Sequence, residues 1–196
     1  YNPGLKSDKF LIYKNNTGTD YDKRNRYRVY LDLKKKDPNI ITIIYPSHFL
    51  KDHNLSYFPL SGLSNRKTIH CNENGYYSIY QSDRYGFNNP DEEWDKDEID
   101  FLLVGDSFTH GACVNEPDTI SGNLRRLSNN KNGILNLGQG GNSSLIEYAS
   151  LREYLPVKQV KQVKRVLWIY FENDIIGLYH ELQNQILIRY LKDKSF

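Results

Sequence analysis

The sequence predicts an α/β protein whose second half is built on a parallel sheet. Three apolar runs, at residues 101–104, 134–137 and 166–171, carry this prediction, and segments with helical spacing separate them. Continuous apolar runs are typical of strands that are buried on both faces of a parallel sheet. Strands that alternate with helices join such a sheet through right-handed crossovers.

The segments that follow the strands carry helix signals. Pro117 suits the first turn of a helix. The run Ser144-Leu145-Ile146-Glu147 fits a capping box, which predicts that a helix begins at Ser144. Apolar spacing also predicts a buried face on each of three helices. The expected faces are Ile120, Leu124 and Leu127, then Leu145, Tyr148 and Leu155, and finally Ile175, Tyr179, Leu182 and Ile186.

The first 95 residues are expected to form a β-rich, loop-rich region. Residues 27–33 alternate between apolar and polar side chains, as a half-buried strand does, and further apolar runs follow at 40–45 and 76–81. Asp91–Asp100 holds seven acids against one lysine, which predicts a solvated linker ending at about residue 100. We therefore predict a β-rich region at 1–95 and an α/β domain at 96–196.

Composition and net charge exclude some classes of protein for this chain. The chain has 196 residues and a net charge of +2, which is too small to argue for a nucleic-acid partner. Basic residues mixed with tyrosine at 23–28, with three lysines at 34–36, would suit RNA, but a solvated face is the preferred interpretation. No apolar run approaches the ~20 residues of a membrane span, and no signal peptide is visible. Because the chain starts at Tyr1 and lacks Met, we expect a fragment or processed form.

Polar and glycine-rich turns follow all three predicted strands. They are Gly105-Asp106-Ser107, Gly138-Gln139-Gly140-Gly141-Asn142 and Glu172-Asn173-Asp174. The carboxyl ends of parallel strands meet at one edge of a sheet, where ligands and chemistry are found. Acyl transfer needs a nucleophilic hydroxyl and donors for the developing oxyanion. Ser107 can supply the hydroxyl, Gly141 a backbone N–H and Asn173 a side-chain amide.

In this order, the three blocks resemble those of the SGNH (GDSL-like) hydrolases. The resemblance covers roughly residues 96–196 and implies a three-layer, flavodoxin-like parallel sheet that is incomplete at its C-terminal end. It also implies Ser107 as nucleophile and an oxyanion hole of Ser107, Gly141 and Asn173, with Gly140 as the near alternative to Gly141. Asp106, Gly140 and Asn142 are expected to contact substrate. Residues 85–89 are similar to members that modify envelope polysaccharides, which implies O-acetyl groups of a carbohydrate as substrate and a place in the cell envelope.

The sequence departs from the family at its last block, Asp-x-x-His. None of the histidines has Asp three residues before it; they are His48, His53, His70, His110 and His180. We therefore expect a nucleophile and an oxyanion hole without their base. We also expect a sheet whose open edge invites self-association. An esterase or O-acyltransferase is the preferred function, and a non-catalytic glycan-binding or scaffold domain is the alternative.

Each site residue also has a structural interpretation. Ser107 can be a turn serine, and Asp106 is expected to bond nearby backbone N–H groups. Gly138, Gly140 and Gly141 can form a tight turn or a phosphate cradle, although no Walker lysine pattern follows them. Asn173 can cap the last helix. His110 is expected to be a structural residue, and His180 is expected to lie on the surface. Cys71 and Cys113 fit no metal spacing and are expected to be free buried thiols. We expect neither a metal nor a cofactor.

Overall fold

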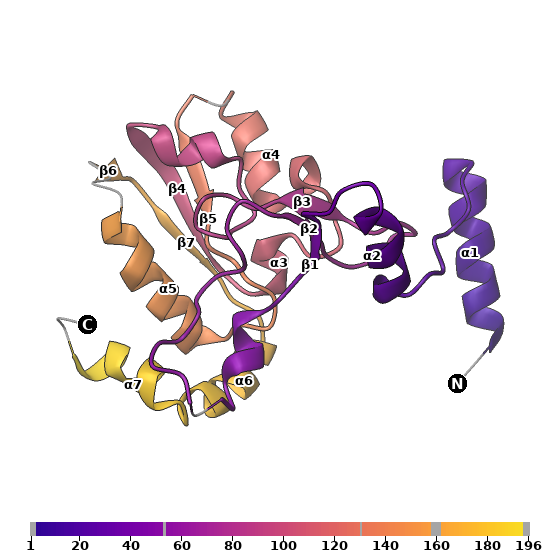
Figure 1. Ribbon diagram of the computed structural model, residues 1–196. Coiled ribbons are helices and arrows are strands. Elements are labelled where there is room, and N and C mark those ends of the chain that lie inside the picture. Colours follow the sequence, from indigo (N-terminus) through magenta and orange to yellow (C-terminus); the bar gives the residue numbers. More distant parts are fainter. Residues whose placement is uncertain (1–2, 53, 130, 158–161, 194–196) are drawn as a thin grey trace.

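The computed structural model describes residues 3–52, 54–129, 131–157 and 162–193 (Figure 1). Over these ranges the chain is a mixed α/β protein with seven α-helices and two small sheets. The helices are α1 (Pro3–Thr17), α2 (Arg26–Lys34), α3 (Ser107–His110), α4 (Ile120–Leu127), α5 (Ser144–Val157), α6 (Asn173–Glu181) and α7 (Gln185–Lys192). The strands are β1 (Ile41–Thr42), β2 (Lys67–Ile69), β3 (Ile79–Gln81), β4 (Glu98–Gly105), β5 (Gly133–Asn136), β6 (Gln162–Val163) and β7 (Val166–Ile169). No helix in the described ranges is long and apolar enough to cross a membrane.

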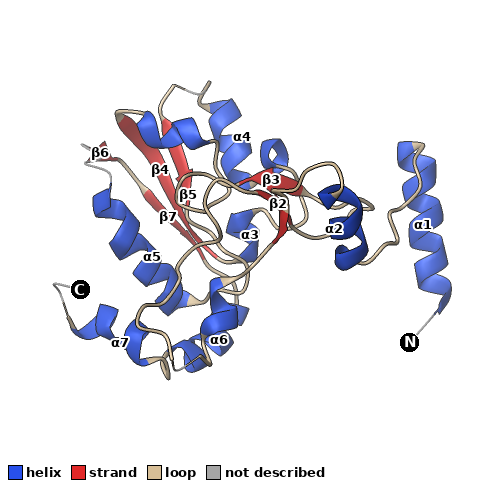
Figure 2. Cartoon of the chain, viewed as in Figure 1, coloured by secondary structure: helices blue, strands red, loops and turns tan. Residues whose placement is uncertain are grey.

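The larger sheet confirms the predicted parallel arrangement. β4 is its central strand, with β5 on one side and both β6 and β7 on the other, and all these pairings are parallel. The register places Leu103 opposite Asn136 and Leu167. In Figure 2, α5 lies alongside this sheet, and α6 and α7 follow at its lower end. β7 was expected to be buried, but Val166 and Trp168 are each 42% exposed because no described strand lies beyond β7.

The first 95 residues are less β-rich than predicted. α1 and α2 contain 15 and 9 residues, whereas β1, β2 and β3 contain only two or three each. Residues 27–33 lie in α2, so the strand predicted there is wrong. The reason is local: the Asn25 side chain accepts a hydrogen bond from the Arg28 N–H at 2.8 Å and caps the helix. The apolar runs at 40–45 and 76–81 do contain β1 and β3.

The predicted apolar face of α4 is also wrong. Its buried residues are Ser121, Gly122 and Arg125, whereas Leu127 is 78% exposed. The Arg125 guanidinium donates to the Ile134 carbonyl and to Asn89 Oδ1, both at 2.7 Å. A buried arginine with these partners turns the polar side of the helix inward.

α5 begins at Ser144, as predicted, but the capping box does not form. The Glu181 carboxylate caps this end instead, accepting the N–H groups of Ser143, Leu145 and Ile146 at 2.6–3.2 Å. Glu147 accepts the Trp168 indole N–H at 2.6 Å. Of the face predicted for α5, Leu145 is buried and Leu155 is exposed.

The last predicted helix is divided into α6 and α7. Asn184 lies between them, and its side-chain oxygen accepts the N–H groups of Ile186 and Leu187, which starts the new helix. The face expected to be buried on α6 is instead solvent-exposed at Ile175, Tyr179 and Leu182.

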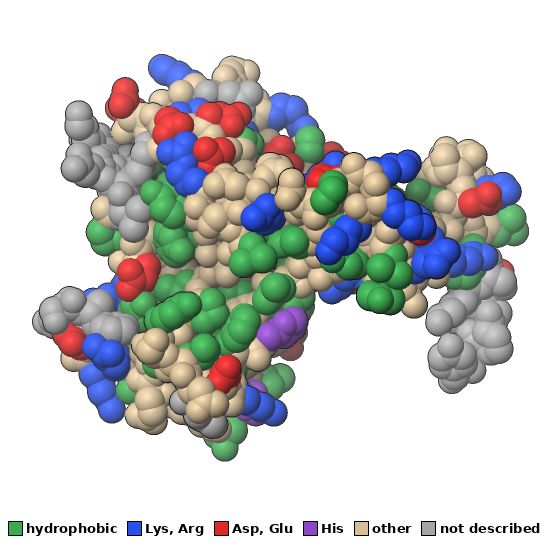
Figure 3. All heavy atoms as spheres, in the orientation of Figure 1, with side chains coloured by type: hydrophobic (Ala, Val, Ile, Leu, Met, Phe, Trp, Pro, Cys, Tyr) green, Lys and Arg blue, Asp and Glu red, His purple; other side chains and the backbone are tan. Residues whose placement is uncertain are grey.

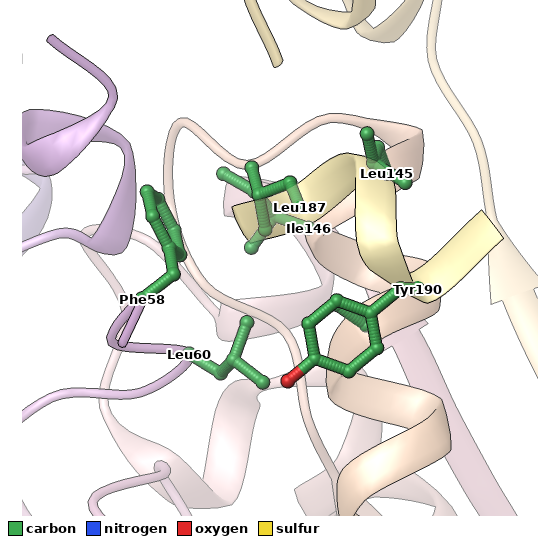
Figure 4. Close-up of a cluster of buried hydrophobic side chains, with 7 residues drawn as sticks. Phe58, Leu60, Leu145, Ile146, Leu187 and Tyr190 are labelled. Carbon is green, nitrogen blue, oxygen red and sulfur yellow. The ribbon is translucent and has the colours of Figure 1, made fainter. Parts of the chain in front are cut away.

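The first region packs onto the second through an apolar cluster. Figure 4 shows Phe58 and Leu60 from the first region against Leu145 and Ile146 of α5 and Leu187 and Tyr190 of α7. The acidic segment 91–100 is not the solvated linker predicted, because two residues at its middle are buried. Glu93 accepts the Ile134 N–H at 2.7 Å, and the Trp94 indole donates to Asp83 at 2.7 Å. The division into two domains at this segment stays a prediction.

Cys71 and Cys113 form a disulfide, so the prediction of free thiols is wrong. Their Cα atoms are 4.7 Å apart, and the bond joins positions separated by 42 residues. Cys71 follows β2, and Cys113 follows α3. The disulfide therefore ties the first region to the turn that follows the candidate nucleophile.

Candidate active site

The Gly-Asp-Ser turn joins the end of β4 to the start of α3. Gly105 has φ +157°, and a side chain there would collide with Thr109, so only glycine fits this turn. Asp106 caps α3: its Oδ1 accepts the Phe108 N–H at 3.0 Å. This confirms the expected structural role of Asp106. The turn leaves Ser107 half-buried at the carboxyl end of the central strand.

Asn173 reaches the same turn from the start of α6. The Ser107 hydroxyl donates to Asp106 Oδ2 at 3.3 Å, and the Asn173 amide donates to the same oxygen at 3.2 Å. The structure thus brings together Asp106, Ser107 and Asn173. The N-cap of α6 is Glu172, so the interpretation of Asn173 as the cap of this helix is wrong.

The glycine turn after β5 distinguishes the two candidate oxyanion glycines. The Gly140 N–H donates to His110 Nδ1 at 3.1 Å and is therefore occupied. Gly141 is exposed, has φ +76°, and its N–H has no hydrogen-bond acceptor among the described residues. Asn142 is only 1% exposed, and its amide has no partner among those residues. Of these three residues, Gly141 is the one whose backbone N–H is free, among the described residues, to donate a hydrogen bond to a ligand.

A cavity of about 660 Å³ lies beside Gly141. It is bounded by residues 47–51 of the first region, by the turn at Gly141 and Ser143, and by the C-terminal half of α6. Ser47 is so close that its hydroxyl oxygen would lie 2.7 Å from a Cβ at Gly141. The sequence did not point to residues 47–51 as part of this site, because only tertiary packing brings them here.

Buried carboxyl groups lie beneath the site. Burial is the largest cause that raises the pKa of Glu147 to about 8, and the charges of Asp174, Glu181 and Asp106 raise it further. Burial also raises the pKa of Glu181 and of Asp174. The Glu147 carboxyl is therefore mostly protonated at neutral pH.

His110 is wholly buried and holds the glycine turn against α3. Its ring lies 4.4 Å from that of His70, measured between centroids. Burial lowers the pKa of His110 well below its usual range and lowers the pKa of His70 to about 4, so both rings are neutral. His180 is exposed on α6, as expected. No described histidine hydrogen-bonds the Ser107 hydroxyl, and no three described His, Cys, Asp or Glu side chains are placed to hold a metal ion.

No protein-family model, curated protein or solved structure matches the chain. The resemblance to the SGNH hydrolases therefore stays a prediction from the three sequence blocks.

Proposed function

We propose that this chain carries the nucleophile and oxyanion hole of an SGNH-like serine esterase. Its substrate would be an O-acyl group, preferably O-acetyl, on a carbohydrate. The observation that carries this proposal is the meeting of the Ser107 hydroxyl and the Asn173 amide at one oxygen of Asp106. In this proposal the parallel sheet is part of a three-layer, flavodoxin-like fold of that family.

The mechanism assigns a role to each group. Ser107 Oγ attacks the acyl carbonyl carbon, and the resulting oxyanion accepts hydrogen bonds from the Ser107 N–H, the Gly141 N–H and the Asn173 amide. The alcohol of the sugar leaves, and water or a second sugar hydroxyl then takes the acyl group from Ser107. The Ser107 proton requires a general base, which we assign to a histidine that is not among the described residues.

The Cys71–Cys113 disulfide supports a location outside the reducing cytosol, such as the cell envelope. Disulfides persist in oxidising compartments and are rare in the cytosol. A polysaccharide of the envelope would be accessible to the protein in such a compartment.

The test is hydrolysis of an aryl acetate by the full-length gene product. Ser107→Ala should abolish hydrolysis, because removal of the nucleophilic hydroxyl leaves little activity. Ser64→Ala, which changes an exposed turn serine of the first region, serves as the matched control. Unchanged turnover in the Ser107→Ala protein would remove Ser107 from the mechanism.

A non-catalytic glycan-binding or scaffold domain is the alternative, and one observation favours it. No described histidine hydrogen-bonds Ser107, so the hydroxyl lacks an activating base within the described residues. An Asp-x-x-His block encoded after Phe196 in the gene would favour the esterase, and the lack of one would favour the binding domain.

A further inference from the structure

The cavity beside Gly141 is built by three segments that are far apart in the sequence. Residues 47–51 come from the first region, Gly141 and Ser143 come from the turn after β5, and the third wall is the second half of α6. In Figure 3, histidine and cationic side chains lie close together low on the face shown, where α6 lies in Figure 1. The cavity is large enough for a sugar-sized ligand.

Three side chains that line this cavity carry nitrogen hydrogen-bond donors. Lys51 supplies an ammonium group, and His48 and His180 supply ring N–H groups. All three side chains are exposed at the rim, and no described carboxylate forms an ion pair with Lys51. A cationic group and two ring N–H donors at one rim are complementary to an anionic ligand.

Glu181 is the one acidic residue that lines the cavity, and its carboxylate is already engaged. It accepts three backbone N–H groups at the start of α5 and is fully buried. Its negative charge is therefore balanced inside the protein rather than presented to the cavity. The free charge at the rim is the positive charge of Lys51.

One turn of α6 connects the cavity to the candidate nucleophile. Asn173 and Gly177 are four residues apart on α6, so they share a face of the helix at a spacing of roughly 6 Å. Asn173 donates to Asp106 beside Ser107, and Gly177 lines the cavity. A side chain at position 177 would collide with Ser143, so glycine brings α6 close to this turn. A substrate whose acyl carbonyl lies at Ser107 would extend its sugar toward the cavity.

We propose that this cavity binds an anionic group, a carboxylate or a phosphate, on the sugar that carries the acyl ester. Lys51 forms the ion pair, and His48 and His180 donate hydrogen bonds. The identity of the sugar rests on the proposed esterase function, but anion binding itself can be measured without turnover. The proposed substrate of the esterase is therefore an acidic carbohydrate.

The test compares three sugars by saturation-transfer NMR titration of the chain. Glucuronate and glucose differ only in the group at C6, and glucose 6-phosphate carries a phosphate there. We expect glucuronate or glucose 6-phosphate to bind several-fold more tightly than glucose. The stronger of the two then identifies the anion as carboxylate or phosphate.

Two variants test the assigned residues. Lys51→Gln should weaken binding of the preferred anionic sugar about fivefold and leave glucose binding unchanged, as expected for a solvent-exposed ion pair. His180→Gln should also weaken it, and Lys131→Gln, which changes an exposed lysine between α4 and β5, should not. Raised salt should weaken binding of the anionic sugars alone.

Two outcomes would overturn the proposal. One is equal affinity for all three sugars, and the other is an equal effect of Lys51→Gln and Lys131→Gln. Neither outcome depends on hydrolysis. Failure of the esterase proposal would appear only in the aryl acetate assay with Ser107→Ala, so the two failures are distinguishable.

Discussion

The Asn173 side-chain amide donates a hydrogen bond to Asp106 Oδ2 at 3.2 Å, which connects the start of α6 to the end of β4. The two residues come from separate sequence blocks, and each follows a strand of the parallel sheet. Because Asp106 Oδ2 also accepts the Ser107 hydroxyl, the amide is held beside the candidate nucleophile. A donor in this position can stabilise negative charge that develops on an acyl group bound to Ser107.

Asn173→Ala in the full-length protein should therefore slow ester hydrolysis by about a hundred- to thousand-fold, the usual cost of losing one oxyanion donor. The protein should stay folded, because the amide is exposed and does not cap α6. The measurement is kcat for an aryl acetate, with Asn16→Ala on α1 as the matched control. A rate within about threefold of wild type, or roughly 0.65 kcal/mol in barrier, would exclude this role.

The parts of the fold that were predicted correctly depend on local signals. β4 contains the apolar run at 101–104 and β5 contains Ile134 and Leu135, which are buried as such runs imply. The start of α5 was also predicted, although for the wrong reason. Residues 144–147 fit a capping box, but the helix is capped by Glu181, which lies 37 positions after Ser144 in the sequence. A local motif cannot reveal that a distant carboxylate takes its hydrogen bonds.

The meeting of Asp106, Ser107 and Asn173 was also predicted, whereas their roles stay predictions. Ser107, Gly141 and Asn173 were found because each follows a strand, and parallel strands end at one edge. The choice between Gly140 and Gly141 needed the structure, because it depends on His110 accepting the Gly140 N–H. Lys51 and His48 were not found, since their place beside Gly141 results from packing of the first region.

The stability of the protein should depend on Glu147. Its pKa is raised to about 8 in the folded state, against an ordinary value of 4.5 for a glutamate carboxyl. Between these pH values the folded protein binds more protons than the unfolded chain, so the free energy of unfolding falls as pH rises from 4.5 to 8. The contribution is on the order of 5 kcal/mol for a shift of this size.

Glu147→Gln should remove most of this slope, because a neutral amide does not titrate. The variant should have a higher free energy of unfolding than the wild type above pH 8. Below pH 8 its free energy of unfolding should change less with pH. Urea unfolding at several pH values measures the effect, with Glu92→Gln at an exposed position as the control. Parallel pH profiles for the wild type and both variants would contradict the buried, protonated carboxyl.

The disulfide should contribute strongly to stability. Cys71 and Cys113 close a loop across 42 positions, for which loop-closure entropy predicts about 4 kcal/mol. The double variant Cys71→Ala/Cys113→Ala should lower the free energy of unfolding by that order, and a reducing agent should destabilise the wild type but not the variant. Denaturant unfolding with and without reductant measures both effects. Two thiols that react with an alkylating reagent in the unreduced, denatured protein would show that the bond is absent.

An exposed apolar surface extends from β7 onto α6. Tyr170 and Phe171 follow β7, and Ile175, Ile176 and Tyr179 lie on α6. Phe108 joins this surface, with its ring centroid 5.1 Å from that of Phe171. A half-exposed aromatic side chain presents roughly 100 Å², so these six side chains together present roughly 600 Å², which is large for an exposed apolar patch on a monomer. β7 is also an edge strand among the described residues.

The chain of 196 residues should therefore self-associate through this surface. Ile176 and Tyr179 are 72% and 68% exposed, so Ile176→Asp and Tyr179→Asp should weaken association without unfolding the protein. Leu127→Asp is the matched control, because Leu127 is equally exposed but lies on α4. Sedimentation velocity over a range of protein concentrations measures the effect. A wild-type monomer at every concentration would contradict the prediction. A Leu127→Asp effect as large as that of Ile176→Asp would also contradict it, because the association would then not depend on the surface formed by β7 and α6.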